Sequence, residues 1–486
     1  MKFEILKYLF VLLIISICFE TGIAQIKFQK IYSGNSYDYG FSVKQANDDG
    51  YFIFGNTSSF GSGNTDIIVI RTDKNGTPLW KKMYGSTGID YGTFAEKTND
   101  NNFLICGYTN NTADTSYNVL LMKIDTLGNL IWSKNYGGSD WDMGHCVLQA
   151  SDLNYYIVGE TYSYGKKNSN FYLIKTNTAG DTIYTKTYGG DSADVANSII
   201  ETKDGKLMLA GYTNSFGAGA ADFYLIKINK NGDTLWTKTY GDVNNNYANS
   251  IMQCNDNGFA LSGYSIKNGN TNNVIYFDKT DSTGNIQWFT CDYGEPTDQK
   301  SNYMFNTLEG NIGMIGYRSQ NTHGGKDMLL NVFDVYNNWV TSGCYGGTKD
   351  DEGVYSQITS DSGLIIVGNT ESFNTSFSSI FLVKTDKNYN TSSTTQEINI
   401  GINTIIGKEK NINVFPNPTT GIINISYENL FHKKLLIKIH DIVGRIVYSD
   451  EIENSASLDI NGFPNGMYFM VLSDGDKKYT IKLIKE

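Results

Sequence analysis

The stretch DFYLIKINKNGDTLWTKTYG (residues 222–241) contains a strand, a glycine turn and a second strand. An apolar run is followed by Asn231-Gly232, a dipeptide that favours a tight hairpin turn, and then by a second run of strand-forming residues. Variants of this stretch recur along most of the 486-residue chain. The recurrence therefore decides the fold class.

The repeat has a fixed length. Tyrosines that close successive units are spaced by 52 residues, and once by 53, and a glycine inside each unit keeps the same step. Two independent landmarks with one period predict seven copies of one structural unit. The tyrosines are Tyr32, Tyr84, Tyr136, Tyr188, Tyr240, Tyr293 and Tyr345, and the glycines are Gly55, Gly107, Gly159, Gly211, Gly263, Gly316 and Gly368.

Each unit contains four strand-like segments separated by turn residues. The two middle segments are apolar on both faces, so neighbouring protein must cover both. Four short antiparallel strands in about 52 residues are typical of a β-propeller blade. The sequence thus predicts an all-β fold with a seven-bladed β-propeller over residues 25–390, whereas an open solenoid would need terminal caps.

The two ends of the repeat predict how the ring closes. The last unit ends after IFLVKTDKNYN (residues 380–390) without a fourth strand, while IKFQKIY (residues 26–32) is a fourth strand with no unit before it. We expect this N-terminal strand to complete the last blade. Phe28 then takes the place that later units give to Trp80, Trp132, Tyr184, Trp236 and Trp288.

Residues 1–24 are predicted to be a secretory signal peptide. Lys2 and Lys7 precede an apolar run, and TGIA before Gln25 is a suitable cleavage site. A lipoprotein anchored through Cys18 is disfavoured because Ser16-Ile17 lacks the small residue expected just before a lipidated cysteine. We expect no membrane span in the mature chain. A net charge of −11 argues against a nucleic-acid partner.

The mature chain has five cysteines with no CxxC pair. An odd number excludes a complete disulfide framework, although one or two bridges stay open in an exported protein. The residues are Cys106, Cys146, Cys254, Cys291 and Cys344.

The repeats resemble known propeller sequences. The pattern LIKxDxxGxxxW resembles the repeats of pyrroloquinoline-quinone-type propellers, and whole units resemble propeller repeats in exported proteins of Bacteroidetes. This resemblance covers residues 25–390 and implies the fold rather than an activity, because propellers carry many functions.

Residues 391–411 are predicted to be a linker, and a different composition begins at residue 412. Short alternating segments with Asn-Pro and Asp-Gly turns predict a small β-sandwich over residues 412–486. This tail resembles the type A C-terminal sorting domain of the type IX secretion system, which implies that the secretion machinery is a partner and that the tail directs export. The motif residues are Pro416, Asn417, Pro418, Gly421, Gly444, Arg445, Gly466 and Tyr468.

Catalytic signatures are sparse. No GxSxG, HExxH, phosphate-loop or GxGxxG pattern occurs, and the four histidines, two of them in the tail, make a multi-histidine metal site improbable. We therefore assign no catalytic residue, metal or cofactor, with calcium in the loops left open. The histidines are His145, His323, His432 and His440.

One polar position recurs six residues after the landmark tyrosines. In propeller connectivity its loop shares a face with the loop before the third strand, so we expect a surface of carboxylates and aromatic rings suited to a carbohydrate or peptide. The opposing interpretation is that the aspartates cap tight turns. The predicted ligand-binding residues are Asp38, Asp90, Asp142, Asp194, Asp351, Trp141, Phe60 and Phe216.

The sequence thus favours an exported or surface-displayed binding or adhesion module. The alternative is a propeller enzyme that acts on extracellular glycans or peptides. An enzyme needs a few polar residues that break the repeat and converge, and the sixth unit, with His323, departs most from the repeat.

Overall fold

The computed structural model describes residues 25–486, except 111–115, 267–271, 292–297, 321, 374, 401–411, 416–418, 428–434, 443, 453–454 and 474–477. The predicted signal peptide therefore lies outside the described residues. The chain divides into two compact units, Met1–Thr404 and Ile405–Glu486. Over the described residues the secondary structure is β, with no helix that could span a membrane.

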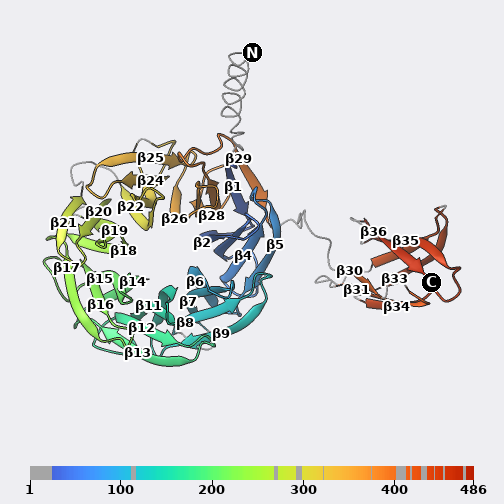
Figure 1. Ribbon diagram of the computed structural model, residues 1–486, viewed down its shortest axis with the longest axis horizontal. Coiled ribbons are helices and arrows are strands. Elements are labelled where there is room, and N and C mark those ends of the chain that lie inside the picture. The colour runs from blue at the N-terminus through green and yellow to red at the C-terminus, as the bar shows by residue number, and fades with distance from the viewer. Residues whose placement is uncertain are drawn as a thin grey trace, which may run out of the picture. The chain divides into compact units, whose positions relative to one another are not determined.

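The first unit consists of repeated antiparallel sheets arranged around a ring (Figure 1). Six of them have four strands in chain order: β2 (Asp38–Gln45), β3 (Tyr51–Thr57), β4 (Asp66–Thr72), β5 (Pro78–Tyr84); β6 (Ile89–Lys97), β7 (Phe103–Asn110), β8 (Asn118–Ile124), β9 (Leu130–Tyr136); β10 (Asp142–Gln149), β11 (Tyr155–Thr161), β12 (Asn170–Thr176), β13 (Thr182–Tyr188); β14 (Asp194–Glu201), β15 (Leu207–Thr213), β16 (Asp222–Ile228), β17 (Thr234–Tyr240); β18 (Asn245–Gln253), β19 (Phe259–Ile266), β20 (Asn273–Thr280), β21 (Ile286–Cys291); and β22 (Gln299–Asn306), β23 (Ile312–Arg318), β24 (Asp327–Phe333), β25 (Trp339–Tyr345).

A further sheet contains both ends of the repeat region. It combines β26 (Asp351–Ile358), β27 (Leu364–Thr370) and β28 (Ser379–Lys384) with β1 (Phe28–Ser33) and β29 (Thr395–Asn399). β1 runs antiparallel to β28, with Phe28 opposite Lys384 and Tyr32 opposite Ile380. The N-terminal strand thus takes the fourth position in the sheet of the last unit.

The predicted linker contributes a strand that its sequence pattern does not predict. β29 runs parallel to β1, with Gln29 opposite Thr395 and Ser33 opposite Asn399. After the turn at Asp386–Asn390 the chain runs beside β1, whose free edge offers unpaired backbone groups. The first part of residues 391–411 therefore extends this sheet.

The landmark tyrosines join neighbouring sheets by bonding a glycine in the turn between the third and fourth strands of the next sheet. The hydroxyl of Tyr84 donates a 2.7 Å hydrogen bond to the carbonyl of Gly128, which turns the third strand of the next sheet into the fourth. Gly128 has φ +74°, a conformation that favours glycine. The same bond, each time 44 residues along the chain, joins Tyr32 to Gly76, Tyr136 to Gly180, Tyr188 to Gly232 and Tyr240 to Gly284.

A repeated lysine in the third strand stabilises the turn between the first two strands. Lys123 Nζ lies 2.6 Å from Asp100 Oδ2, and Lys279 Nζ lies 2.7 Å from Asp256 Oδ2. These lysines are buried, so each needs a nearby carboxylate. The lysine of the LIKxD pattern is therefore part of the fold.

The core lies between adjacent sheets. Phe52 and Phe54 of one sheet pack on Phe103 of the next, with ring centroids 4.4 and 5.4 Å from that of Phe103. The middle strands β3 and β4 are buried along their whole length. Each sheet is thus covered on both faces, as the apolar pattern predicts.

The second unit is a small β domain. One sheet holds β30 (Ile412–Phe415), β31 (Ile422–Tyr427) and β34 (Ser455–Asp459), and the other holds β32 (Leu435–His440), β33 (Ile446–Ile452), β35 (Gly466–Ser473) and β36 (Lys478–Lys485). Ile423 and Ile425 of the first sheet share one buried cluster with Ile437, Ile439 and Met470 of the second. The two sheets therefore have a common core.

Candidate functional site

The predicted aspartates are the first residue of the first strand of their sheets, or the second in the case of Asp90, and all are buried. Asp38 is typical: its carboxylate accepts hydrogen bonds from the Gly34 amide (2.8 Å), the Ser59 hydroxyl (2.9 Å) and the Thr57 hydroxyl (2.5 Å). Matching bonds to a backbone amide and a serine hydroxyl hold Asp90, Asp142, Asp194 and Asp351.

These carboxylates are buried rather than exposed on an open surface, and ligand contact by them stays a prediction. Burial raises the pKa of Asp38, and the hydrogen bonds from Thr57 and Ser59 act in the opposite direction. Burial likewise raises the pKa of Asp351 to about 6. Their role is to close the loop before the first strand, which is the turn-capping interpretation.

The two loops that were expected to share a face do lie together. The Asp90 amide donates a 2.9 Å hydrogen bond to the Thr65 carbonyl, and the Asp142 amide donates a 2.8 Å bond to the Tyr117 carbonyl. In each case the loop before the first strand contacts the loop before the third strand of the preceding sheet. We call this side of the ring the loop face.

Two of the three predicted aromatic residues are exposed on the loop face. Trp141 exposes 46% of its surface and Phe216 exposes 45%. Phe60 is half-buried, with Lys81 Nζ 3.7 Å from its ring centroid. Ligand contact by these rings stays a prediction.

Tyrosines form two groups of touching rings next to these loops. Tyr91 stacks on Tyr108 at 5.2 Å, Tyr108 meets Tyr117 at 5.3 Å, and Tyr117 meets Trp141 at 5.4 Å. The second group is Tyr212, Tyr247 and Tyr264, with centroids 4.8 and 5.0 Å apart. Tyr91, Tyr108, Tyr212, Tyr247 and Tyr264 belong to the first two strands of their sheets, at the ends next to the loop face. The first strands line the inside of the ring, and we call its end at the loop face the channel mouth.

Inside the ring, each first strand has a bulge at one repeated position. The bulge residues lie nine residues after the landmark tyrosines and follow the 52-residue step. They are Phe41, Thr93, His145, Asn197, Asn249, Asn302 and Val354.

Most bulge side chains contact the next sheet through one kind of hydrogen bond. Thr93 donates to the Gly144 carbonyl at 2.9 Å, and Asn197, Asn249 and Asn302 donate to the carbonyls of Ala248, Ser301 and Gly353, each at 2.8 Å. His145 Nδ1 lies 3.1 Å from the Ala196 carbonyl, which fits the same pattern with the proton on Nδ1. We call this series the hydrogen-bond belt.

Phe41 and Val354 are apolar and cannot join the belt. At these two junctions an asparagine of the second strand replaces the bulge residue: Asn56 pairs with both backbone groups of Gly92, and Asn369 accepts from the Gly40 amide at 2.9 Å. The bulge positions at these two junctions therefore do not need a hydrogen-bonding side chain.

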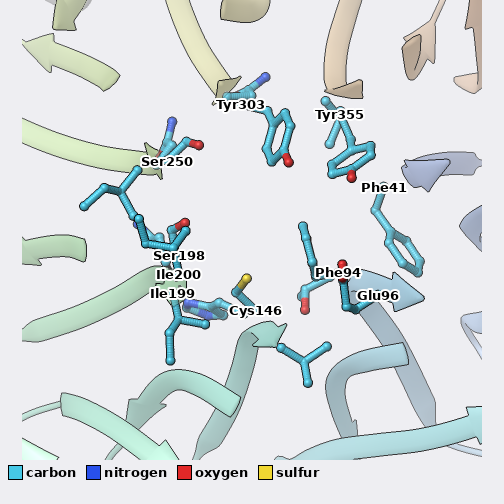
Figure 2. A pocket seen from close by; sticks show the side chains of 18 of the residues that line it. Phe41, Phe94, Glu96, Cys146, Ser198, Ile199, Ile200, Ser250, Tyr303 and Tyr355 are labelled. Atoms are coloured by element: carbon cyan, nitrogen blue, oxygen red, sulfur yellow. Dashed lines mark hydrogen bonds between the residues drawn. The ribbon is translucent and has the colours of Figure 1, made fainter. Parts of the chain in front are cut away.

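The first strands enclose a cavity of about 490 Å³. Figure 2 shows Tyr303 and Tyr355 on one side of it and Ser198, Ile199 and Ile200 on another. The cavity therefore has a phenolic wall and a largely aliphatic wall.

The phenolic wall holds a charged pair, in which Lys44 is buried and Glu96 is half-buried. Lys44 Nζ donates to Tyr355 Oη at 2.6 Å and lies 3.1 Å from Glu96 Oε2. The Tyr303 and Tyr355 rings lie 4.3 Å apart, and burial raises the pKa of both phenols. No sequence pattern indicates this cluster, because its residues come from four sheets that are far apart in the chain.

Side chains able to hold a metal gather at one place in the described residues: His323, Asp327 and Cys344. Burial and then Asp327 raise the pKa of the Cys344 thiol to about 11, although Arg318 acts in the opposite direction. Cys106, Cys146 and Cys254 are buried free thiols, and the side chain of Cys291 lies outside the described residues.

Part of the sorting motif can be placed in the second unit. Tyr468 is buried, and its hydroxyl donates to the Pro464 carbonyl at 2.7 Å, which holds the turn that contains Gly466. Arg445 Nε lies 2.7 Å from Asp441 Oδ2 beside Gly444. The Gly421 carbonyl accepts from the Ile460 amide, and Pro416, Asn417 and Pro418 lie outside the described residues.

The repeated four-stranded sheets and the channel define the chain as a β-propeller protein with a separate C-terminal β domain. Residues 413–486 match the family described as the secretion system C-terminal sorting domain. The chain therefore carries a type IX sorting domain and is directed to the cell surface or the extracellular space. The machinery of that system is accordingly a partner.

Solved structures give distant matches. PorZ, a surface component of the type IX secretion system of Porphyromonas gingivalis, is 11% identical, with a TM-score of 0.40 over 94% of this chain and 60% of PorZ. The propeller domain of a Pyrococcus furiosus protease is 12% identical, with a TM-score of 0.43 over 73% of this chain and 97% of that domain.

A puromycin hydrolase is 9% identical, with a TM-score of 0.46 over 80% of this chain and 58% of the hydrolase. The chain thus spans about 60% of the length of PorZ and of the hydrolase. A search of curated proteins finds no match. At these identities and TM-scores the matches carry no inference about activity.

Proposed function

We propose that this chain is an exported propeller that binds an extracellular glycan at the channel mouth on the loop face. The observation that carries the proposal is the group formed by Tyr91, Tyr108, Tyr117 and Trp141, whose rings touch in sequence. Aromatic rings present flat apolar surfaces to the C–H groups of a sugar, while phenol hydroxyls accept and donate hydrogen bonds.

The charge of the mouth suits a neutral or weakly charged ligand. Lys300 Nζ lies 5.1 Å from the ring centroid of Tyr264, and Lys326 Nζ lies 4.4 Å from that of Tyr317 and 2.8 Å from Asp298 Oδ2. Two lysines and one carboxylate thus lie beside tyrosine rings, so a ligand that offers hydroxyl groups finds donors and an acceptor together.

A glycan array probed with the full chain tests the proposal. Trp141→Ala and Tyr108→Ala are expected to weaken binding of the selected glycan at least tenfold. Tyr336→Ala is the matched control, because Tyr336 is 80% exposed but lies in the turn between β24 and β25 rather than on the loop face. Binding of peptides without glycans, or equal losses in all three variants, would contradict the proposal.

An enzyme acting on glycans or peptides is the second candidate, and the cluster of Lys44, Glu96, Tyr303 and Tyr355 at the cavity wall favours it. A carboxylate held beside a lysine and a phenol is a group that could transfer a proton. The Glu96→Gln variant separates the two functions. It should abolish turnover of a glycan or peptide pool in an enzyme, but leave affinity at the loop face unchanged in a binding module.

We also propose that the sheets form a closed seven-bladed ring. The pairing of β1 with β28 supports this, as do the contacts between the first and last sheets: the Gln45 amide donates to Gln357 Oε1 at 2.9 Å, and Lys44 bonds Tyr355. Cysteines introduced at Gln29 and Val383, which are opposite each other, should form a disulfide on oxidation. Cysteines at Gln29 and Leu382, which point to opposite faces, should not, and equal yields would refute closure in this register.

A further inference from the structure

The sixth sheet, β22–β25, carries a side-chain cluster that the proposed glycan-binding role does not use. His323 lies in the loop before β24, Asp327 begins β24, and Cys344 is the penultimate residue of β25. Asp327 Oδ2 is 2.8 Å from His323 Nδ1 and 3.2 Å from Cys344 Sγ, and the ligand atoms of all three residues lie within 4.8 Å of one another. An imidazole nitrogen, a carboxylate oxygen and a sulfur therefore meet at one point.

This cluster departs from a structural position that other sheets share. Asp66 and Asp222 occupy the place of Asp327 and accept backbone hydrogen bonds from Gly63 and Gly219 at 3.0 and 2.9 Å. The position of His323, four residues before the aspartate, is occupied by Ser62 in the first sheet and by Ala218 in the fourth. The position of Cys344 in the fourth strand is occupied by Met83 and Thr239 in these two sheets. Two ligand-type residues thus replace non-ligating ones around the same aspartate.

The two oxygens of the Asp327 carboxylate have different surroundings: Oδ2 also accepts a 2.7 Å hydrogen bond from the His323 backbone amide, whereas Oδ1 has none from the described residues. The residue is completely buried. Across Gly346, both Asp327 Oδ1 and Asp351 Oδ2 lie 2.5 Å from the position that a Cβ would take, so two buried carboxylates face the same small space. A buried carboxylate in this setting is stabilised by a bound cation.

The site is also accessible from solvent. The His323 side chain is 60% exposed, whereas Asp327 is buried and Cys344 is half-buried. A cation can therefore enter from the loop face, and the exposed imidazole can adjust its position with little cost to the packing.

We propose that His323, Asp327 and Cys344 bind a divalent cation of the zinc class, with water completing the coordination. Zinc takes histidine nitrogen, cysteine sulfur and carboxylate oxygen, and tetrahedral bonds of about 2.0–2.3 Å place such ligand atoms about 3.3–3.7 Å apart. The two contacts of Asp327 Oδ2 are slightly shorter than this, so a few tenths of an ångström of movement by His323 and Cys344 accommodates the ion. Calcium and magnesium are disfavoured, because both prefer oxygen ligands.

Cobalt(II) titration of the full chain, followed by competition with zinc, tests the site. Cobalt bound through a thiolate gives a sulfur-to-metal charge-transfer band in the near ultraviolet. We expect one equivalent to produce this band and zinc to abolish it. His323→Ala and Cys344→Ser should each weaken cobalt binding at least tenfold, and Cys344→Ser should also remove the band.

Asp222→Asn is the matched control, since it changes the equivalent aspartate in a sheet without the histidine and cysteine. It should leave the affinity and the band unchanged, and thermal melts of every variant separate loss of the site from loss of the fold. Absence of the band in the folded wild-type chain, or unchanged cobalt binding in folded Cys344→Ser, would overturn the proposal. Neither result bears on glycan binding, which Trp141→Ala tests separately.

Discussion

Asp278 places a carboxylate at a core position of the fifth sheet and should make the stability of the propeller depend on pH. Other third strands have Ile70, Met122, Ile174 or Ile226 at this position of the repeat. Asp278 is completely buried in β20, and neither of its oxygens has a hydrogen-bond partner among the described residues. Burial raises the pKa of its carboxyl from 3.8 to about 8.

The sign of the effect follows from the raised pKa. The folded chain holds the proton more tightly than the unfolded chain, so the contribution to stability is complete below pH 4 and is lost as the pH rises toward 8. At 1.36 kcal/mol per pKa unit, a difference of about four units corresponds to at most about 5 kcal/mol above pH 8. Within this window the loss approaches about 1.4 kcal/mol per pH unit.

The test compares wild type with Asp278→Asn, a change that keeps the size and removes the charge. Urea unfolding of both chains is followed by tryptophan fluorescence at pH 5, 7 and 9. The variant should gain stability over wild type between pH 5 and pH 9. Asn331, at the same repeat position in the sixth sheet, supplies the reverse control, because Asn331→Asp should introduce a pH dependence. Parallel loss of stability in wild type and Asp278→Asn would refute the reasoning.

Three further predictions concern the fold and export. Tyr188→Phe removes the 2.7 Å hydrogen bond to the Gly232 carbonyl and should lower the free energy of unfolding by about 1 kcal/mol. Urea unfolding measures this change, and an unchanged midpoint would contradict the prediction. Asn197→Ala leaves the Ala248 carbonyl without its belt partner and should cost about 1–3 kcal/mol in the same assay, against less than about 0.5 kcal/mol for the exposed Asn231→Ala. Deletion of residues 413–486 should keep the propeller inside the cell envelope, measured by fractionation, and undiminished release would contradict the role of the tail.

The strand pattern could be predicted from sequence because its markers have local physical causes. Gly128 and its equivalents recur because the hairpin turn needs positive φ, and Tyr84 and its equivalents recur because the phenol bonds that turn in the next sheet. A residue that makes the same contact in every sheet recurs at a constant spacing. The period and the four strands per unit could therefore be predicted from the sequence without knowledge of the contacts themselves.

The site was less predictable, because a repeated residue type does not reveal which way a side chain points. Asp38 and Trp141 both lie near the loop face, yet one is buried and the other exposed. The cluster of Lys44, Glu96 and Tyr355 depends on contacts across as many as 311 residues, and β29 depends on an edge offered by the N-terminal strand. No periodicity records such contacts, although the fixed offset of the bulge residues from the tyrosines could have pointed to the belt.

The belt explains why the interior is asymmetric. At five junctions the bulge side chain itself holds the next sheet, so these positions must keep a donor such as Thr93 or Asn197. At the two junctions on either side of the first sheet, Asn56 and Asn369 hold the neighbouring backbone from the second strand. The bulge residues at these junctions, Phe41 and Val354, do not have to donate a hydrogen bond to the next sheet, and both are apolar. Lys44 of the same first sheet contacts Glu96 and Tyr355 of the two adjacent sheets. The cluster therefore lies at the two junctions where the bulge position does not need a hydrogen-bond donor. A function specific to this chain is therefore to be sought around the first sheet and the repeat-breaking sixth sheet, rather than at positions that recur in every sheet.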